Sequence, residues 1–357
     1  PLRVCVWLAQ MKAGMWVRNG MSLRHQAGTY RGVTQRDVTY HRDIFLLQTA
    51  LVVCDPSRVL ASMVDRFGME KWCKGIFEQK VKAQDDSQHL DVVEDMIHLL
   101  IVLLSDRTML IPSDEGETSE RAAIRRDLVH ILCFKPLTFS EICSKLPDKV
   151  SDREDIDSFL DEMTTFKAPE GLNDVGLFEL KPEFYEEIDP YITHYNKTHR
   201  EEAEMAYRKA VAKKTGKSVD DIIYEPKLKP ITSGIFTRLA EFTGTGVFAQ
   251  VIYYSLLYTL KYQDFTPSIQ ATRVETFLQM LLHLIMCSIM EDKTTEQDGE
   301  EVPSFVVNAL IKQARSNFMA EHANKKSIVA LLDLLLSKDD FKACHQKIIV
   351  ILRRMHE

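Results

Sequence analysis

The 357-residue sequence lacks the short motifs that mark most enzyme active sites. It has no P-loop, no G-x-G-x-x-G, no G-x-S-x-G and no H-E-x-x-H. Cys143 could be imagined as a nucleophile, but its neighbours "SEICSKLP" place it on the face of a helix. His98, His130 and His283 lie in apolar helical stretches, which is typical of core or helix-edge histidines. The sequence therefore predicts no bond chemistry within this chain and no catalytic residue.

Cysteine pairs with the spacing of metal ligands are also missing. The seven cysteines are scattered and include no C-x-x-C pair: Cys5, Cys54, Cys73, Cys133, Cys143, Cys287 and Cys344. This pattern predicts buried, reduced thiols in an intracellular protein, and no Cys/His group supports a zinc site. We therefore expect no metal and no cofactor in this chain.

A targeting signal and a long apolar run are absent as well. The opening "PLRVCVWLAQ" has no methionine and no charged segment before a long apolar run, which indicates a fragment of a longer protein rather than a signal peptide. The longest apolar runs cover residues 96–104 and 277–290, short of the roughly 20 residues that a membrane span needs. We predict that both are buried helices. The net charge of −7 argues weakly against a nucleic-acid partner.

Helical apolar spacing is what the sequence has in abundance. It predicts a mainly α fold, a helical scaffold with an embedded winged-helix domain, and it shows no short internal repeat. We expect four regions: an N-terminal helical scaffold (1–110), a winged-helix domain (118–190), a long polar helix with an extended arm (191–231) and a C-terminal helical bundle (232–357). Trp7, Trp16 and Trp72 all fall in the first region, where we expect core packing.

The winged-helix prediction rests on the order of elements between residues 119 and 190. Helical patterns in "SERAAIRRDLVHILCF", "LTFSEICSKLP" and "SDREDIDSFLDEM" precede a turn and the strand-like "LFEL". Thr138 or Ser140 could cap the second helix, and Pro147 would end it. The alternative is a three-helix bundle followed by a loose loop.

The third helix of this pattern, residues 151–163, would occupy the position that usually reads DNA. Only Arg153 opposes its six carboxylates, which are Asp152, Glu154, Asp155, Asp157, Asp161 and Glu162. Since DNA binding relies on cations at the phosphates, and the wing offers only Lys181, we predict that this element does not bind DNA. A helical scaffold with the winged helix as an interaction module is the favoured class.

A polar helix is predicted over residues 197–218, with glutamates near its start and lysines near its end. This order suits the helix macrodipole, and its thin apolar stripe is insufficient to anchor it in a core. Pro226 and Pro230 make the following "IIYEPKLKPI" extended. The segment is either a solvated connector or a docking element for another protein.

Three stretches resemble the middle region of the UBR-type N-recognins, the RING ubiquitin ligases of the N-degron pathway, and the sequence looks fungal. They are "AGMWVRNGMSL" (13–23), "LLQTALVVCDPSRVL" (46–60) and "FKAPEGLNDVGLFELKPEFYEEIDPY" (166–191). The match covers most of the chain up to about residue 270.

The resemblance implies a scaffold between substrate-binding modules and a RING domain, with zinc only in the flanking UBR box and RING. It implies two kinds of partner, a ubiquitin-conjugating enzyme and substrates bound through flanking modules, with neither nucleic acid nor membrane. It also implies a cytoplasmic location, with the nucleus as a second one. Candidate residues for docking the conjugating enzyme are Tyr207, Arg208, Val211, Lys213, Lys214, Tyr224 and Pro226. The runner-up class is a cullin-type or proteasome-lid-type scaffold subunit, with DNA binding third.

Overall fold

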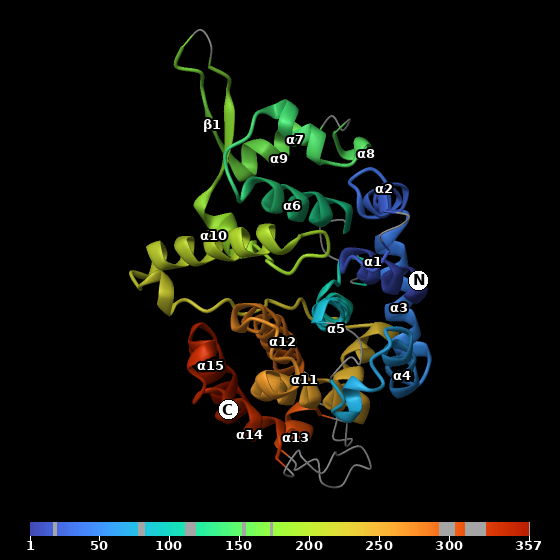
Figure 1. Ribbon diagram of the computed structural model, residues 1–357. Coiled ribbons are helices and arrows are strands. Elements are labelled where there is room, and N and C mark those ends of the chain that lie inside the picture. The colour runs from blue at the N-terminus through green and yellow to red at the C-terminus, as the bar shows by residue number, and fades with distance from the viewer. Residues whose placement is uncertain are drawn as a thin grey trace. The chain divides into compact units, whose positions relative to one another are not determined.

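The computed structural model describes residues 1–16, 20–77, 83–110, 119–151, 155–171, 174–292, 304–310 and 326–356 (Figure 1). These residues are mainly helical, as predicted. Chain contacts divide them into two compact units. We call residues 1–24, 43–105 and 226–357 the bundle unit, and residues 25–42 and 106–225 the winged-helix unit.

Helices make up the bundle unit. Its elements are α1 (Leu2–Lys12), α4 (Pro56–Arg66), η2 (Trp72–Lys74), α5 (Ala83–Ser105), η5 (Ile235–Gly244), α11 (Gly246–Phe265), α12 (Ala271–Asp292), α13 (Phe305–Leu310), α14 (Ile328–Leu335), η8 (Asp339–Cys344) and α15 (His345–His356). Two further helices, α2 (Gly20–Arg31) and α3 (Tyr40–Val53), each run from one unit into the other. The N-terminal and C-terminal helical regions thus share one unit, while the predicted domain boundaries stay predictions.

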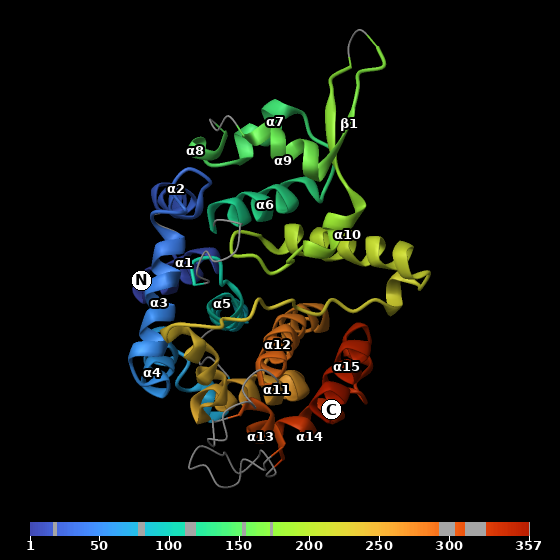
Figure 2. The same ribbon diagram turned by 180° about the vertical axis from the view of Figure 1, so that it is seen from behind.

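The core of the bundle unit is formed by α12, which packs against α5, α11 and α15 (Figure 2). Nearly every residue of α12 from Phe277 to Ile289 is buried, as predicted for its apolar run. Among the described residues α12 is the one helix long and apolar enough to cross a membrane by length and composition, yet 78% of that window is buried inside the protein. Such burial is typical of the core helix of a folded domain.

The three tryptophans of the bundle unit do not share one environment. Trp72 is 1% exposed and lies in the core, whereas Trp7 and Trp16 are 43% and 40% exposed, so the prediction of core packing is wrong for these two. The Arg3 guanidinium lies 4.8 Å from the centre of the Trp7 ring. Trp16 Nε1 donates to Gln10 Oε1 at 3.2 Å. The long side chains of neighbouring residues cover part of each ring, which lowers the cost of leaving it near solvent.

The described part of the winged-helix unit contains three main helices and one short one, followed by a hairpin and a long final helix. Its elements are α6 (Ser119–Leu132), α7 (Phe139–Lys145), α8 (Asp148–Ser151), α9 (Ile156–Met163), β1 (Thr164–Lys167), β2 (Leu177–Leu180), η3 (Pro182–Glu187), α10 (Lys197–Thr215) and η4 (Val219–Asp221). The order of three helices followed by a hairpin confirms the predicted winged-helix pattern. Thr138 caps α7 with a full capping box, as one of the two predicted caps.

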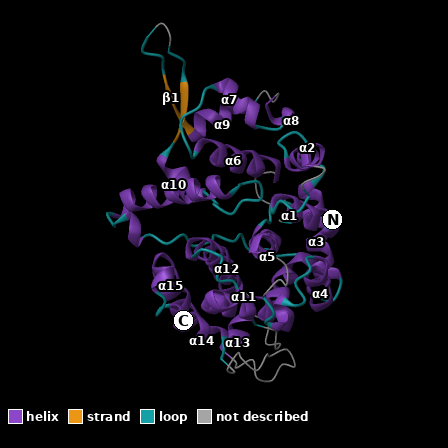
Figure 3. Ribbon diagram, viewed as in Figure 1, coloured by secondary structure: helices purple, strands orange, loops and turns teal. Residues whose placement is uncertain are grey.

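The hairpin is the wing (Figure 3). Its strands pair antiparallel with Phe166 opposite Phe178, and Leu137 bridges to Phe178 on the other side of β2. The sequence prediction missed β1, since "TTFK" directly follows α9 and its burial pattern shows no alternation. Gly176 lies beneath the Phe166 ring, where an added Cβ would stand 2.5 Å from that ring. A side chain larger than hydrogen at Gly176 would therefore displace Phe166.

The acidic third helix is shorter than predicted. It begins at Ile156 rather than at residue 151, because α8 ends at Ser151, and residues 152–154 lie outside the described residues. Its apolar residues Ile156, Phe159, Leu160 and Met163 are buried, as predicted. Its carboxylates meet basic residues of α6: Glu162 bonds Arg125, and Asp155 lies 3.6 Å from Arg121. Part of the acidity is therefore neutralised within the unit.

All seven cysteines are free thiols in the structure, and five of them are buried. Cys54 is exposed and Cys143 is half-buried, so the prediction of buried thiols holds for the majority. Burial raises the pKa of Cys133 to about 11 and that of Cys73 to about 12. Such thiols are unreactive while the fold is intact.

Candidate functional site

Helix α10 is the polar helix predicted over residues 197–218, and both of its ends are set by local chemistry. At its start the Asn196 side chain accepts from the His199 backbone N–H at 2.8 Å. At its end Gly216 adopts a left-handed φ of 72°, which only glycine adopts at little cost. Ala203, Tyr207 and Ala212 are buried on one side, where α10 packs against η3 and η4.

This buried side holds three of the seven predicted docking residues. The rings of Tyr207 and Tyr224 meet edge to face with centroids 5.0 Å apart. Arg208 donates from Nε and Nη2 to the Val219 carbonyl oxygen at 3.1 and 2.8 Å. Tyr207, Arg208 and Tyr224 therefore hold η4 and the arm against α10.

Of the other predicted docking residues, Val211 is half-buried and Pro226 is buried. Residues 222–230 form neither helix nor strand, in agreement with the predicted extended arm.

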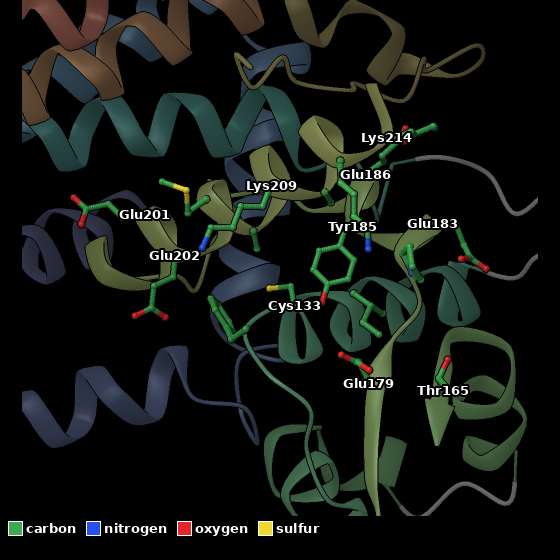
Figure 4. Close-up of a pocket in the computed structure, with 17 residues that line it drawn as sticks. Cys133, Thr165, Glu179, Glu183, Tyr185, Glu186, Glu201, Glu202, Lys209 and Lys214 are labelled. Carbon is green, nitrogen blue, oxygen red and sulfur yellow. Dashed lines mark hydrogen bonds and ion pairs between the residues drawn. The ribbon is translucent and has the colours of Figure 1, made fainter. Parts of the chain in front are cut away.

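A groove of about 1440 Å³ opens on another side of α10 (Figure 4). It is lined by residues from the end of α6, from the hairpin, from η3 and from α10: Cys133, Phe134, Thr165, Glu179, Leu180, Pro182, Glu183, Tyr185, Glu186, Glu201, Glu202, Met205, Ala206, Lys209, Ala210, Lys213 and Lys214. Of the seven predicted docking residues, only Lys213 and Lys214 lie here. The structure thus separates that set into two different surfaces.

The α10 wall of the groove changes charge along its length. Glu201 and Glu202 lie near the start of the helix, whereas Lys209, Lys213 and Lys214 lie toward its end. Lys214 is bound to Glu186 of η3. Lys209 and Lys213 are exposed and form no ion pair within the described part of the chain. Two lysines of this wall are therefore available to a partner.

Apolar groups form the floor of the groove. Leu180 and Cys133 are buried there, and Met205 is 39% exposed beside them. Burial raises the pKa of the Tyr185 hydroxyl, which keeps this ring neutral. No cluster of His, Cys, Asp and Glu able to hold a metal occurs among the described residues. The groove has the composition of a protein-binding surface, an apolar centre with a charged rim.

The sequence carried a usable signal for this wall. Residues 201, 205, 209 and 213 recur every four positions, as do 202, 206, 210 and 214, and both rows lie on one side of a helix. The seven residues predicted from the sequence followed neither row, and they did not include Met205. The sequence alone could not locate the opposite wall, which comes from residues 133–186.

The fold and the groove first define a class, a helical scaffold joined to a winged-helix domain. Two family models match the chain: the "E3 ubiquitin-protein ligase UBR1-like, winged-helix domain" over residues 123–222 and the "UBR1/2/3-like ARM repeat domain" over residues 1–99. The chain belongs to the UBR1/UBR2 family of E3 ubiquitin ligases, of which it represents one region.

Individual relatives agree with this assignment. The chain is 33% identical over 296 residues to the E3 ubiquitin-protein ligase ubr1 of Schizosaccharomyces pombe. The matched residues make up 83% of this chain and 14% of the relative. It is 28% identical over 345 residues to human UBR2, covering 94% and 18%, and 28% identical over 348 residues to UBR1 of Saccharomyces cerevisiae, covering 94% and 17%. The chain thus spans less than a fifth of the length of each of these relatives.

Proposed function

We propose that this chain is the scaffold region of a RING-type ubiquitin ligase of the N-degron pathway, and that α10 docks the ubiquitin-conjugating enzyme. The relatives are named E3 ubiquitin-protein ligases, which supports the general role. The single observation that carries the docking role is the exposed pair Lys209 and Lys213 on a groove with an apolar floor. Substrates reach the ligase through modules that flank this region, and we propose a cytoplasmic and nuclear location.

The scaffold acts by position. A RING ligase holds a charged conjugating enzyme near a bound substrate, and such proximity accounts for much of the rate gain. A second contact between the ligase and the same enzyme raises the local concentration of that enzyme at the RING. Lysines on an exposed helix also steer an acidic surface during approach.

We divide this role among the residues of α10 and the arm according to their contacts. Tyr207, Arg208 and Tyr224 are engaged in holding the arm, so in this proposal they position α10 rather than touch the enzyme. Lys209, Lys213 and Met205 make the contact from the groove side. Lys214 contributes less, since its ammonium group is already bound to Glu186.

Nucleic acid is not a partner in this proposal. Asp157, Asp161 and Glu162 lie exposed on α9, the helix that would face a duplex. Lys181, directly after β2, is directed back onto α9, where its Nζ donates to the carbonyl oxygens of Asp161 and Glu162 at 2.9 and 2.6 Å. Lys167 of β1, which the sequence analysis did not count as a cation of the wing, is paired with Glu179. Neither the carboxylates of α9 nor Lys181 offers the phosphate contacts on which DNA affinity depends.

The test is calorimetric titration of the 357-residue chain with its cognate ubiquitin-conjugating enzyme. We expect binding that weakens about tenfold in the double variant Lys209→Glu with Lys213→Glu, because two attractive charges become repulsive. Lys214→Glu should weaken binding less than Lys213→Glu. Lys217→Glu is the matched control, since Lys217 is an exposed lysine beyond Gly216 and outside the groove.

Absence of binding heat at high concentration would contradict the docking role. So would equal weakening by Lys217→Glu and by Lys213→Glu, which would indicate a general charge effect rather than a surface. Circular dichroism of each variant checks that α10 remains folded.

A further inference from the structure

The α10 wall of the groove consists of four pairs of residues, which we call rungs. Residues 201 and 202, 205 and 206, 209 and 210, and 213 and 214 all line it, one pair for each turn of the helix. From residue 201 to residue 214 this wall is about 20 Å long, at 1.5 Å per residue. A partner with the same repeat would meet every rung with side chains three or four residues apart.

The size of the groove fits a helix better than a small ligand. Pockets for small molecules have volumes of about 300–1,000 Å³. The groove's volume of about 1440 Å³ exceeds this range, and a wall about 20 Å long matches about four turns of a helix. The exposed Met205 and the half-buried Ala206 and Ala210 give the middle of the wall a low, apolar surface on which a helix can lie.

The order of charges along the groove indicates where a partner would carry its acidic and basic groups. On the wall opposite α10, Glu186 is bound to Lys214, and Glu179 lies 2.6 Å from Lys167. These two carboxylates are paired, whereas Glu183 of the same wall is exposed. On α10, Glu201 lies 3.8 Å from Lys197, while Lys209 and Lys213 have no ion pair within the described residues. A complementary partner must place acidic groups at the lysine end and basic groups at the glutamate end.

We infer that the groove holds an amphipathic α-helix of a partner protein, antiparallel to α10, with acidic residues in its first turn and basic residues in its last turn. The acidic turn faces Lys209 and Lys213, and the basic turn faces Glu201 and Glu202. This direction also suits the macrodipoles of both helices, since the positive N-terminus of each lies beside the negative C-terminus of the other. The inference rests on the docking role proposed for α10 and adds the shape, direction and charge order of what docks.

The test uses two synthetic helical peptides of about 16 residues. Both carry the same apolar face and a lactam bridge that fixes the helix; one has the acidic turn first, and the other has the basic turn first. Their fluorescence anisotropy is titrated with the 357-residue chain. We expect the acid-first peptide to bind about tenfold more tightly than the basic-first peptide.

A charge-swapped chain then tests complementarity directly. Its four substitutions, all at exposed positions, are Glu201→Lys, Glu202→Lys, Lys209→Glu and Lys213→Glu. The preference should reverse in this variant, so that the basic-first peptide binds more tightly. Met205→Glu should weaken both peptides, while Lys217→Glu should weaken neither.

Equal binding of the two peptides to both chains, or no binding at millimolar concentration, would overturn this inference. The conjugating enzyme is titrated in parallel into the same preparations. If the enzyme binds but the charge swap fails to reverse the peptide preference, the docking role stands and the antiparallel helix does not. If the preference reverses but the enzyme does not bind, the groove holds a helix of another partner, and the docking of the enzyme is wrong.

Discussion

The bundle unit and the winged-helix unit are stabilised by different interactions. Trp72 shows the principle of the bundle unit: its ring lies 4.8 Å from Phe77, 4.7 Å from Tyr258 and 6.0 Å from Phe277, centroid to centroid. The winged-helix unit also has ion pairs around α6, between side chains that are buried or half-buried, and Arg273 with Asp91 and Glu94 forms a comparable cluster in the bundle unit. Arg126 lies 3.1 Å from Asp106 and 3.7 Å from Asp189, and Arg36 lies 3.0 Å from Asp127.

The two units should respond differently to substitutions and to pH. Apolar packing loses stability in proportion to the volume removed, whereas a buried ion pair loses it when one partner is left without the other. The apolar unit should therefore depend on bulk, and the polar unit on charge and pH. Cysteines give each unit a reporter, since Cys73 and Cys287 are buried in the bundle unit and Cys133 is buried in the winged-helix unit.

The largest effect should come from Trp72→Ala in the bundle unit. It removes a ring that is 1% exposed and the hydrogen bond from Trp72 Nε1 to Ser255 Oγ at 3.1 Å. We expect the free energy of unfolding of this unit to fall by about 4 kcal/mol. Pulsed alkylation of Cys73 and Cys287 across a urea series measures it. Trp7→Ala, at a 43% exposed ring, is the control and should cost about 0.5 kcal/mol or less. Equal losses in the two variants would contradict the packing argument.

Much of the bundle unit could be predicted from sequence because apolar residues there recur with the helical period. The helices near residues 246–265 and 271–292 follow directly from that period. The match to a family model named for ARM repeats over residues 1–99 did not follow from that period. Each helical repeat needs apolar residues of suitable size rather than particular letters, so the repeat is visible in a family model and not in one sequence.

The order of elements in the winged-helix unit was predicted, but the segments of the chain that belong to the unit were not all predicted. Residues 25–42 belong to it by contact, although they lie far from residues 106–225 in the sequence and outside the winged-helix family match. Arg31 donates to the Thr193 carbonyl oxygen, and Arg36 pairs with Asp127. Such partners lie 162 and 91 residues apart along the chain, and no local pattern indicates a pairing of this kind. The groove escaped prediction for the same reason, since its walls come from separate elements.

Arg36→Ala tests the polar basis of the winged-helix unit. The Arg36 side chain is 4% exposed, and burial raises the pKa of Asp127 although the Arg36 charge opposes this. Removing the guanidinium leaves a buried carboxyl without its nearest cation, so we expect a loss of about 3 kcal/mol. Cys133 alkylation in urea should report this loss, whereas Cys287 should not.

Two further variants test whether the lost ion pair causes the loss of stability in Arg36→Ala. Arg42→Ala changes an exposed arginine of the same segment and should have little effect. Arg36→Met combined with Asp127→Asn should recover most of the loss, because it removes both charges and keeps the volume. If the double variant is as unstable as Arg36→Ala, the ion pair is not the cause.

The smallest of the three effects is a pH dependence of the winged-helix unit. His130 Nδ1 lies 2.6 Å from the Arg126 carbonyl oxygen, to which it donates, and its Nε2 accepts from the Asp189 backbone N–H at 2.8 Å. Burial lowers the pKa of His130 to about 3, and Arg126 acts in the same direction. A neutral ring with both nitrogens bonded has no place for a second proton.

The sign follows from comparison with the unfolded chain, where the histidine pKa is about 6.5. The unfolded chain binds the proton first as the pH falls, so stability present above pH 6.5 is lost progressively down to the folded pKa of about 3. Between pH 6.5 and 5 the loss from His130 is about 2 kcal/mol. His194, whose pKa burial lowers to about 2, adds to it. Asp127 and Asp189 act oppositely at lower pH, because their raised pKa values make the folded state the better proton acceptor.

Urea unfolding is carried out at pH 6.5 and at pH 5, and each sample then receives a short alkylation pulse at pH 8 in the same urea. The difference between the two series gives the slope of unfolding free energy against pH for each unit. Cys133 should become accessible at lower urea at pH 5 than at pH 6.5. Cys287 reports the same comparison for the bundle unit, where burial lowers the pKa of His89. His130→Gln removes the titrating ring and should flatten the Cys133 slope while lowering stability at pH 6.5. An unchanged slope in that variant would assign the pH dependence to His194 or to the carboxyls, and the contrast between the two units would then rest on charge pairs alone.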